Sequence, residues 1–328
     1  MPSRILCFLV VAALVGCSSD DSFPIVPATS TPRPSATSTP VPTHTSVPTA
    51  TSTPPPTATH TPDSAALAAA GERAFAESLA GIADRDEEAI EILSAATAAN
   101  PSDGRSFFLL GMMHLYRASQ KLTDWRRPSE FVLAESQRAQ TALDRAVPLD
   151  SGDRRVPGFR GAVTYLNGAL NGDAERRELG IQQLRAAIEL YPDFNNFSFL
   201  GAVAPVVAPA DPLFLEALDL VRLALMSGCG PLTQPTICGN EGKAPHNVQG
   251  AMMMFGDMFT KAGDANQARV YYGLGLALDG ASTWRFRTAA EERLNTADER
   301  ALLWNDEDPA NDPPFAGNGS EACAICHH

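Results

Sequence analysis

Residues 250–275 read GAMMMFGDMFTKAGDANQARVYYGLG. Large apolar side chains recur in this stretch at intervals of three and four residues, which is the period of a helix with one buried face. The pattern breaks once, at Gly263-Asp264, and then resumes. The stretch therefore predicts two helices joined by a tight turn. The residues that carry the pattern are Met252, Phe255, Gly256 and Phe259 in the first helix and Ala268, Tyr272 and Gly275 in the second.

The same helical period continues through most of residues 64–305. Ala, Leu and Met are frequent there, runs of β-branched residues are few, and no long alternating strand pattern occurs. A segment of roughly 240 residues is long enough to bury a sizeable core. We therefore predict an all-α domain over residues 64–305. Clear examples of the period are Ala89, Ile90, Leu93, Ala96 and Ala99, and later Ile181, Leu184, Ala187, Ile188 and Tyr191.

The order of large, small and aromatic residues in these helices resembles the tetratricopeptide family. In that family the first helix of a repeat carries a large residue, Leu-Gly and an aromatic residue, and the second carries small residues and ends near a proline. The resemblance covers about two thirds of the chain, but insertions such as Lys121–Glu130 interrupt the repeat period. A generic helical bundle is the alternative. Besides residues 250–275, the matching positions are Ala89, Leu93, Ala96 and Pro101, then Phe107, Leu110, Gly111 and His114, then Ala139, Leu143 and Ala146, and finally Gly180, Leu184, Ala187, Pro192, Phe197, Leu200 and Gly201.

The resemblance implies an α-solenoid, a stack of helix pairs in which each pair buries a face only on its neighbours. Such stacks expose a concave groove that binds peptides or proteins. A protein partner in this groove is therefore an expectation that comes from the resemblance.

One segment, residues 228–245, departs from the helical pattern. It is rich in Gly and Pro and contains Cys229 and Cys238. Outside the cytoplasm, a disulfide between these two cysteines is the expected state. The alternative is a metal site that adds His246.

Residues 1–17 have the features of a targeting segment. Arg4 supplies a positive charge, and the apolar run Ile5–Val15 is too short for a permanent membrane-spanning helix. The run ends in Leu14-Val15-Gly16-Cys17, which resembles the lipobox of bacterial lipoproteins. The resemblance implies cleavage before Cys17, a lipid on Cys17 and, because Ser18 follows, sorting to the outer membrane. A plain secretory signal with an incidental cysteine is the alternative.

Residues 18–63 are predicted to be a disordered linker. From Thr29 to Pro62 the sequence is almost wholly Thr, Ser, Pro and Ala. Such a segment has too few apolar side chains to offset the entropy lost on folding. Proline biases it toward extended conformations, so it would hold the helical domain away from the membrane.

The predicted irregular tail, residues 306–328, ends in Cys323-Ala324-Ile325-Cys326-His327-His328. Cys-x-x-Cys-His resembles the attachment motif of c-type cytochromes. The resemblance implies one covalent haem, held by thioether bonds from Cys323 and Cys326, with His327 as an axial iron ligand. The alternatives are a disulfide, or a metal clip that also uses His328. Because only His328 follows the motif, the haem pocket is expected to come from upstream residues.

A six-coordinate haem needs a second axial ligand, usually His or Met. Core packing is the competing role for the methionines, because Met fills irregular gaps well. If none of these residues serves, the iron would be five-coordinate. The candidate ligands are Met252, Met253, Met254, Met258, His114 and His246.

The formal net charge of −13 argues against binding to nucleic acid. The acidic surface is compatible with a basic redox partner. No phosphate-binding loop, zinc-protease helix or nucleophile elbow occurs. The sequence thus predicts a lipid-anchored envelope protein with a haem-bearing tail, active in electron transfer or redox sensing. The alternative is an interaction scaffold without haem.

Overall fold

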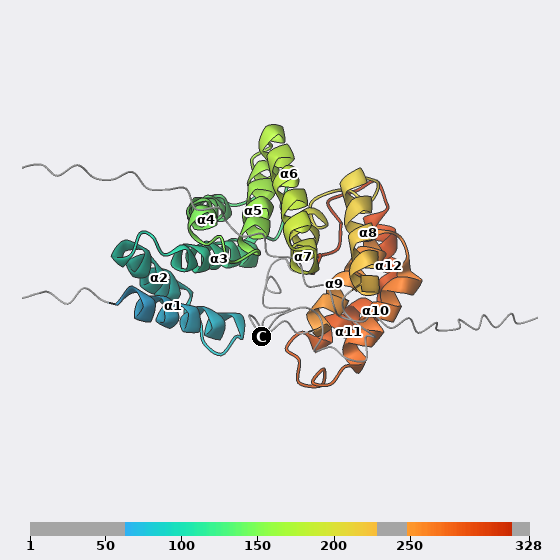
Figure 1. Ribbon diagram of the computed structural model, residues 1–328. Helices are drawn as coiled ribbons and strands as arrows, with labels where there is room; N and C mark the ends of the chain where they lie inside the picture. The colour runs from blue at the N-terminus through green and yellow to red at the C-terminus, as the bar shows by residue number, and fades with distance from the viewer. Residues whose placement is uncertain (1–62, 228–247, 317–328) are drawn as a thin grey trace, which may run out of the picture. The chain divides into compact units, whose positions relative to one another are not determined.

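The computed structural model describes residues 63–227 and 248–316, and every regular element among them is an α-helix (Figure 1). This confirms the predicted all-α class. The first six helices are α1 Ser64–Leu79, α2 Asp86–Ala99, α3 Gly104–Lys121, α4 Glu130–Leu149, α5 Val156–Leu170 and α6 Ala174–Leu190. The others are α7 Pro192–Val203, α8 Pro212–Ser227, α9 Val248–Lys261, α10 Ala265–Ala277, α11 Arg287–Asn295 and α12 Ala297–Trp304.

Side chains at the residue before each helix fix where several helices begin. Asp63 accepts a hydrogen bond from the backbone of α1, and Asp103 does the same for α3. A carboxylate at this position satisfies a backbone N–H that has no partner within the helix, and it also faces the positive end of the helix dipole. Asp173 and Asp264 cap α6 and α10 in the same way, and the hydroxyl of Ser129 accepts the corresponding hydrogen bond at α4.

Two of the inter-helix turns use the same Gly-Asp pair. Gly172 and Gly263 adopt positive φ angles, 67° and 82°, which end α5 and α9. The next residue in each case, Asp173 or Asp264, donates its N–H to a carbonyl five residues back and then caps the following helix. This is the usual way in which glycine ends a helix, so one dipeptide both stops a helix and starts its partner.

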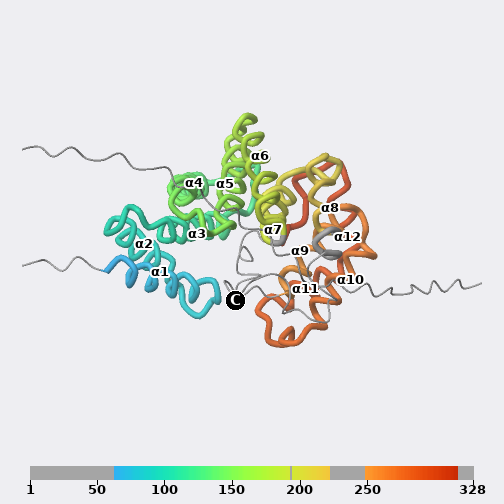
Figure 2. Tube along the Cα trace, in the orientation of Figure 1, coloured from blue at the N-terminus to red at the C-terminus, as the bar shows by residue number. Residues whose placement is uncertain are grey.

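The most extensive helix contacts join chain neighbours, namely α1 with α2, α3 with α4, α5 with α6 and α9 with α10, and these pairs lie side by side in Figure 2. Glycine allows the close approach in all four of them, as two examples show. A Cβ on Gly256 of α9 would come within 2.2 Å of the Tyr272 ring of α10, and one on Gly111 of α3 would come within 2.8 Å of Leu143 of α4. The small residues predicted at these positions are therefore where the helices meet.

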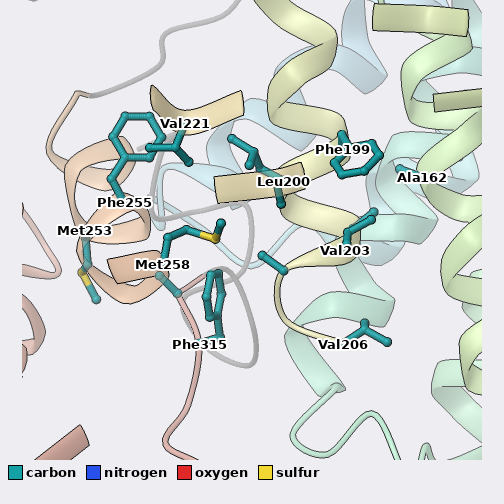
Figure 3. Packing of buried hydrophobic residues seen from close by; sticks show 14 of the residues in the cluster. Ala162, Phe199, Leu200, Val203, Val206, Val221, Met253, Phe255, Met258 and Phe315 are labelled. Atoms are coloured by element: carbon teal, nitrogen blue, oxygen red, sulfur yellow. The ribbon is translucent and has the colours of Figure 1, made fainter. Parts of the chain in front are cut away.

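The methionines of α9 fill the core. Met252, Met253 and Met258 are buried in the main hydrophobic cluster, and Met254 packs against it from a partly buried position. The cluster continues into α7, α8 and α10, and Figure 3 shows several of its members. Within the described residues, no helix is both long enough and apolar enough to cross a membrane.

After α12, the chain continues as an irregular segment, Asp306–Ala316, which we call the strap. Its last two residues, Phe315 and Ala316, are buried in the main cluster. Phe315 lies near Met258 of α9 in Figure 3. Packed residues thus continue past Asn305, where the sequence places the end of the helical domain.

Candidate functional site

The predicted terminal, lipid and disulfide sites lie outside the described residues. These residues are Cys17, Cys229, Cys238, His246, Cys323, Cys326, His327 and His328. The described part of the chain does contain the strap, which leads directly toward the terminal motif. The contacts of the strap are therefore the described part of the candidate site.

Among the candidate axial ligands, the methionines of α9 have the packing role described above. His114 is on α3 and is buried, with Nδ1 2.8 Å from Oε2 of the buried Glu135 on α4. Burial lowers the pKa of His114, although the hydrogen bond to Glu135 and its charge oppose this effect, so the imidazole is neutral near pH 7. In that state Nδ1–H donates to Glu135 and the lone pair is on Nε2, a tautomer that carboxylates often impose on histidine.

The strap ends at a buried carboxylate, that of Asp257 on α9, which is 0% exposed. The hydroxyl of Tyr272 on α10 donates to Oδ1 at 2.5 Å, and Arg293 Nε on α11 lies 3.2 Å from both oxygens. Arg300 Nη2 on α12 lies 3.2 Å from Oδ1, and the backbone N–H of Ala316 donates to Oδ2 at 2.7 Å. One carboxylate therefore joins three helices and the strap.

The same cluster also holds the strap by a carbonyl. Arg300 Nη2, which contacts Asp257, donates to the Pro314 C=O at 2.7 Å. The ring of Phe315, between these two anchored peptide groups, packs edge-on against Trp304 with centroids 6.5 Å apart. The strap is thus held at a backbone acceptor, a side chain and a backbone donor in consecutive residues. We call Asp257, Arg300 and Trp304 the clamp.

Burial and the charge of Asp257 both raise the pKa of Tyr272. The phenol therefore stays protonated and acts as a donor to the carboxylate. The Tyr272 hydroxyl is also 3.0 Å from the Thr260 hydroxyl, which in turn donates to the Gly256 C=O at 2.9 Å.

Lys261, one turn after Asp257 on α9, is 1% exposed. Its Nζ donates to the Ala204 C=O at 2.8 Å and lies 4.3 Å from the centre of the Trp304 ring, with Phe214 and Phe315 farther away. Burial lowers its pKa to about 8, although Asp312 of the strap partly opposes this effect. An ammonium group in aromatic surroundings gains cation–π attraction that compensates in part for lost water.

A second, exposed contact holds the beginning of the strap. Arg126, in the connection between α3 and α4, donates to the Pro309 C=O at 3.0 Å and pairs with Asp312 at 2.7 Å. This connection lies within the predicted insertion Lys121–Glu130. Exposed ion pairs contribute little, typically about 0–1 kcal/mol, so the buried clamp is the stronger anchor.

The clamp residues were not predicted from the sequence. A signal was present, because Asp257 and Lys261 are charged residues four apart within a stretch whose apolar residues surround them on both sides. Charges on a fully buried helix must be paired, so they indicate partners elsewhere in the chain. The sequence does not say which distant residues those partners are.

The donor set of the clamp suits a peptide segment better than a metal ion. Asp257 is a single carboxylate that faces two guanidinium groups, a phenol and a backbone N–H. The two guanidinium cations would repel a metal ion. In residues 63–227 and 248–316, no three His, Cys, Asp or Glu side chains form a group that could hold a metal ion. No protein-family model matches the chain, and no curated protein is significantly similar to it in sequence.

Proposed function

We propose that this protein is a lipid-anchored component of the bacterial cell envelope, with one covalent c-type haem at its C-terminal motif, acting in electron transfer or redox sensing. The observation that carries the proposal is the sequence Cys323-Ala324-Ile325-Cys326-His327 in a chain whose residues 1–17 resemble an export signal. Haem is attached to cysteine outside the cytoplasm, so the two features agree.

The residues of the motif have distinct roles in this proposal. The thiols of Cys323 and Cys326 bond to the two vinyl groups of the porphyrin, and the imidazole of His327 binds the iron. The haem supplies one-electron redox chemistry when bound. The two thiols and the imidazole are the donor set that the attachment requires, and the lipid on Cys17 would keep the protein at the outer membrane.

We further propose that the helix pairs form a degenerate tetratricopeptide-like array. The support is the close pairing of α3 with α4 and of α9 with α10 through Gly111 and Gly256. In such an array, a groove for a protein partner accompanies the redox group. The partner would be another envelope protein that receives or delivers electrons.

The first experiment is a pyridine haemochrome spectrum of the protein produced with a cytochrome c maturation system. A c-type spectrum that survives acid–acetone extraction is expected, because thioether bonds resist extraction. Cys326→Ala should lose one thioether and shift the spectrum, whereas the adjacent His328→Ala should leave it unchanged. Full-length protein without covalent haem, whether or not it holds extractable haem, would contradict the proposal.

The second candidate function is an interaction scaffold, which the paired helices favour. In that case the terminal cysteines and histidines act as a disulfide or metal clip. Deletion of residues 321–328 discriminates the two functions, because a scaffold keeps its partner binding and a redox protein loses its activity.

A further inference from the structure

The clamp recognises one register of the strap. The Asp257 carboxylate accepts a hydrogen bond from the N–H of Ala316, and Arg300 donates one to the C=O of Pro314. Phe315, between them, fills the space against Trp304. A shift of the strap by one residue would put Pro314 or Ala316 in that space, and neither side chain is large enough to fill it.

The charges in the clamp are more than a means of joining helices. Burial of a carboxylate with two guanidinium groups has a high desolvation cost, and apolar residues of similar volume often serve a core equally well. What charged groups add is direction, because their hydrogen bonds select particular backbone atoms. In this cluster, the atoms selected outside the helices belong to Pro314 and Ala316 of the strap.

We propose that Asp257 and Arg300 are positioning residues that keep the terminal Cys-x-x-Cys-His motif at short range from helices α9 and α12. The purpose of this positioning rests on the proposed function, but the clamp can be tested without haem. Only residues 317–322 separate Ala316 from Cys323. Seven steps along an extended chain span at most about 25 Å, so a haem bound there stays near the clamp.

Short range matters for a redox group. A haem on a free tail would present its edge to any partner in any orientation, and a haem held near the body is approached from fewer directions. Such restriction favours a specific partner over random electron exchange. The clamp therefore limits how far the haem can move from helices α9 and α12.

Trp304 provides a reporter for the clamp. Its indole is buried, it packs on Phe315, and it lies 4.3 Å from the Lys261 ammonium. Release of the strap would hydrate the indole and move its emission to longer wavelength. A haem held nearby would also quench this emission by energy transfer.

The test compares Ala316→Pro with Ala316→Gly in the full-length, haem-loaded protein. Proline removes the N–H that Asp257 accepts, whereas glycine keeps it, and neither substitution alters the helices. Amide hydrogen exchange of residues 305–315 should be about tenfold or more faster in the proline variant, as expected for loss of one charged hydrogen bond. Its tryptophan emission should be at longer wavelength and less quenched, with equal haem content in both variants.

Equal exchange and equal quenching in the two variants would overturn the positioning proposal while leaving the proposed function intact. If the chain binds no haem, the proposed function fails. Amide hydrogen exchange of the strap then tests by itself whether Asp257 holds the strap. Faster exchange in Ala316→Pro than in Ala316→Gly then supports the clamp, and equal exchange overturns it.

Discussion

The backbone N–H of Ala316 donates to the buried carboxylate of Asp257 at 2.7 Å, across 59 positions of sequence. Ala316 is the last described residue before the terminal motif, and Asp257 is in the middle of α9. This contact connects the part of the chain that carries the proposed redox group to the part with the best defined helix pair. It also joins a costly buried charge to a segment without regular structure.

The first prediction concerns that charge. Asp257→Ala leaves Arg293 and Arg300 buried without their carboxylate, which is expected to lower the free energy of unfolding by about 3–5 kcal/mol. Urea unfolding followed by circular dichroism measures the change. The control is Asp298→Ala on α12, whose side chain is 73% exposed and pairs with Arg269, so about 1 kcal/mol or less should be lost. Similar losses in both variants would contradict the role of Asp257.

The second prediction is a pH dependence that originates from Lys261. Its pKa is about 8 in the folded protein and 10.5 as the ordinary value, so between these values the unfolded chain binds more protons. Stability therefore rises with pH through this window, and the burial cost of the ammonium, about 3 kcal/mol, is fully present below pH 8. Lys261→Met should remove this dependence and be the more stable protein at pH 7.

The measurement for Lys261 is urea unfolding of parent and variant from pH 7 to pH 10, taken as the difference between the two. Lys121→Met, at the exposed end of α3, is the matched control and should leave the pH dependence unchanged. A parallel pH dependence in the parent and in Lys261→Met would show that Lys261 titrates normally in the folded state.

The third prediction tests the contact between α9 and α10. Gly256→Ala places a Cβ 2.2 Å from the Tyr272 ring and should destabilise the protein by about 1–3 kcal/mol, because the helices must separate. Gly273→Ala, on α10, meets nothing within 4 Å and should instead stabilise by about 0.5–1 kcal/mol through helix propensity. Thermal unfolding of the two variants should therefore shift in opposite directions, and a shared direction would refute the close approach.

The helix pairs could be predicted because their determinants are local. In residues 250–275, the apolar period, the Gly263-Asp264 turn and the small Gly256 are all within a few residues of one another, and the structure contains α9, the turn and α10 there. The burial of Met252 follows from the same period, whereas Met253 and Met258 lie outside it and are buried because α9 is packed on almost every side.

The cluster around Asp257 could not be predicted, because its members come from four separate segments. Asp257, Arg293, Arg300 and Ala316 have no common spacing, and α11 and α12 are short and rich in charged residues, so their sequence alone does not indicate burial. The burial of the end of the strap could not be predicted either, because Asp, Asn and Pro usually mark exposed loops. Only the three-dimensional contacts reveal that this polar stretch ends in a buried phenylalanine.

The last prediction separates charge from geometry at Arg300. Arg300→Lys keeps the positive charge beside Asp257, but the shorter lysine side chain does not reach the position of Nη2, the one nitrogen that contacts both Asp257 Oδ1 and the Pro314 C=O. The protein should stay folded and lose about 1.5–3 kcal/mol of stability, the range of one hydrogen bond to a charged group. Amide exchange should increase in residues 305–316 and stay unchanged in α3 and α4. Arg287→Lys, at the exposed pair with Glu291 on α11, should change neither quantity. If Arg300→Lys exchanges like the parent, the positive charge alone holds the strap, and the hydrogen bond from Nη2 to Pro314 contributes nothing to its position.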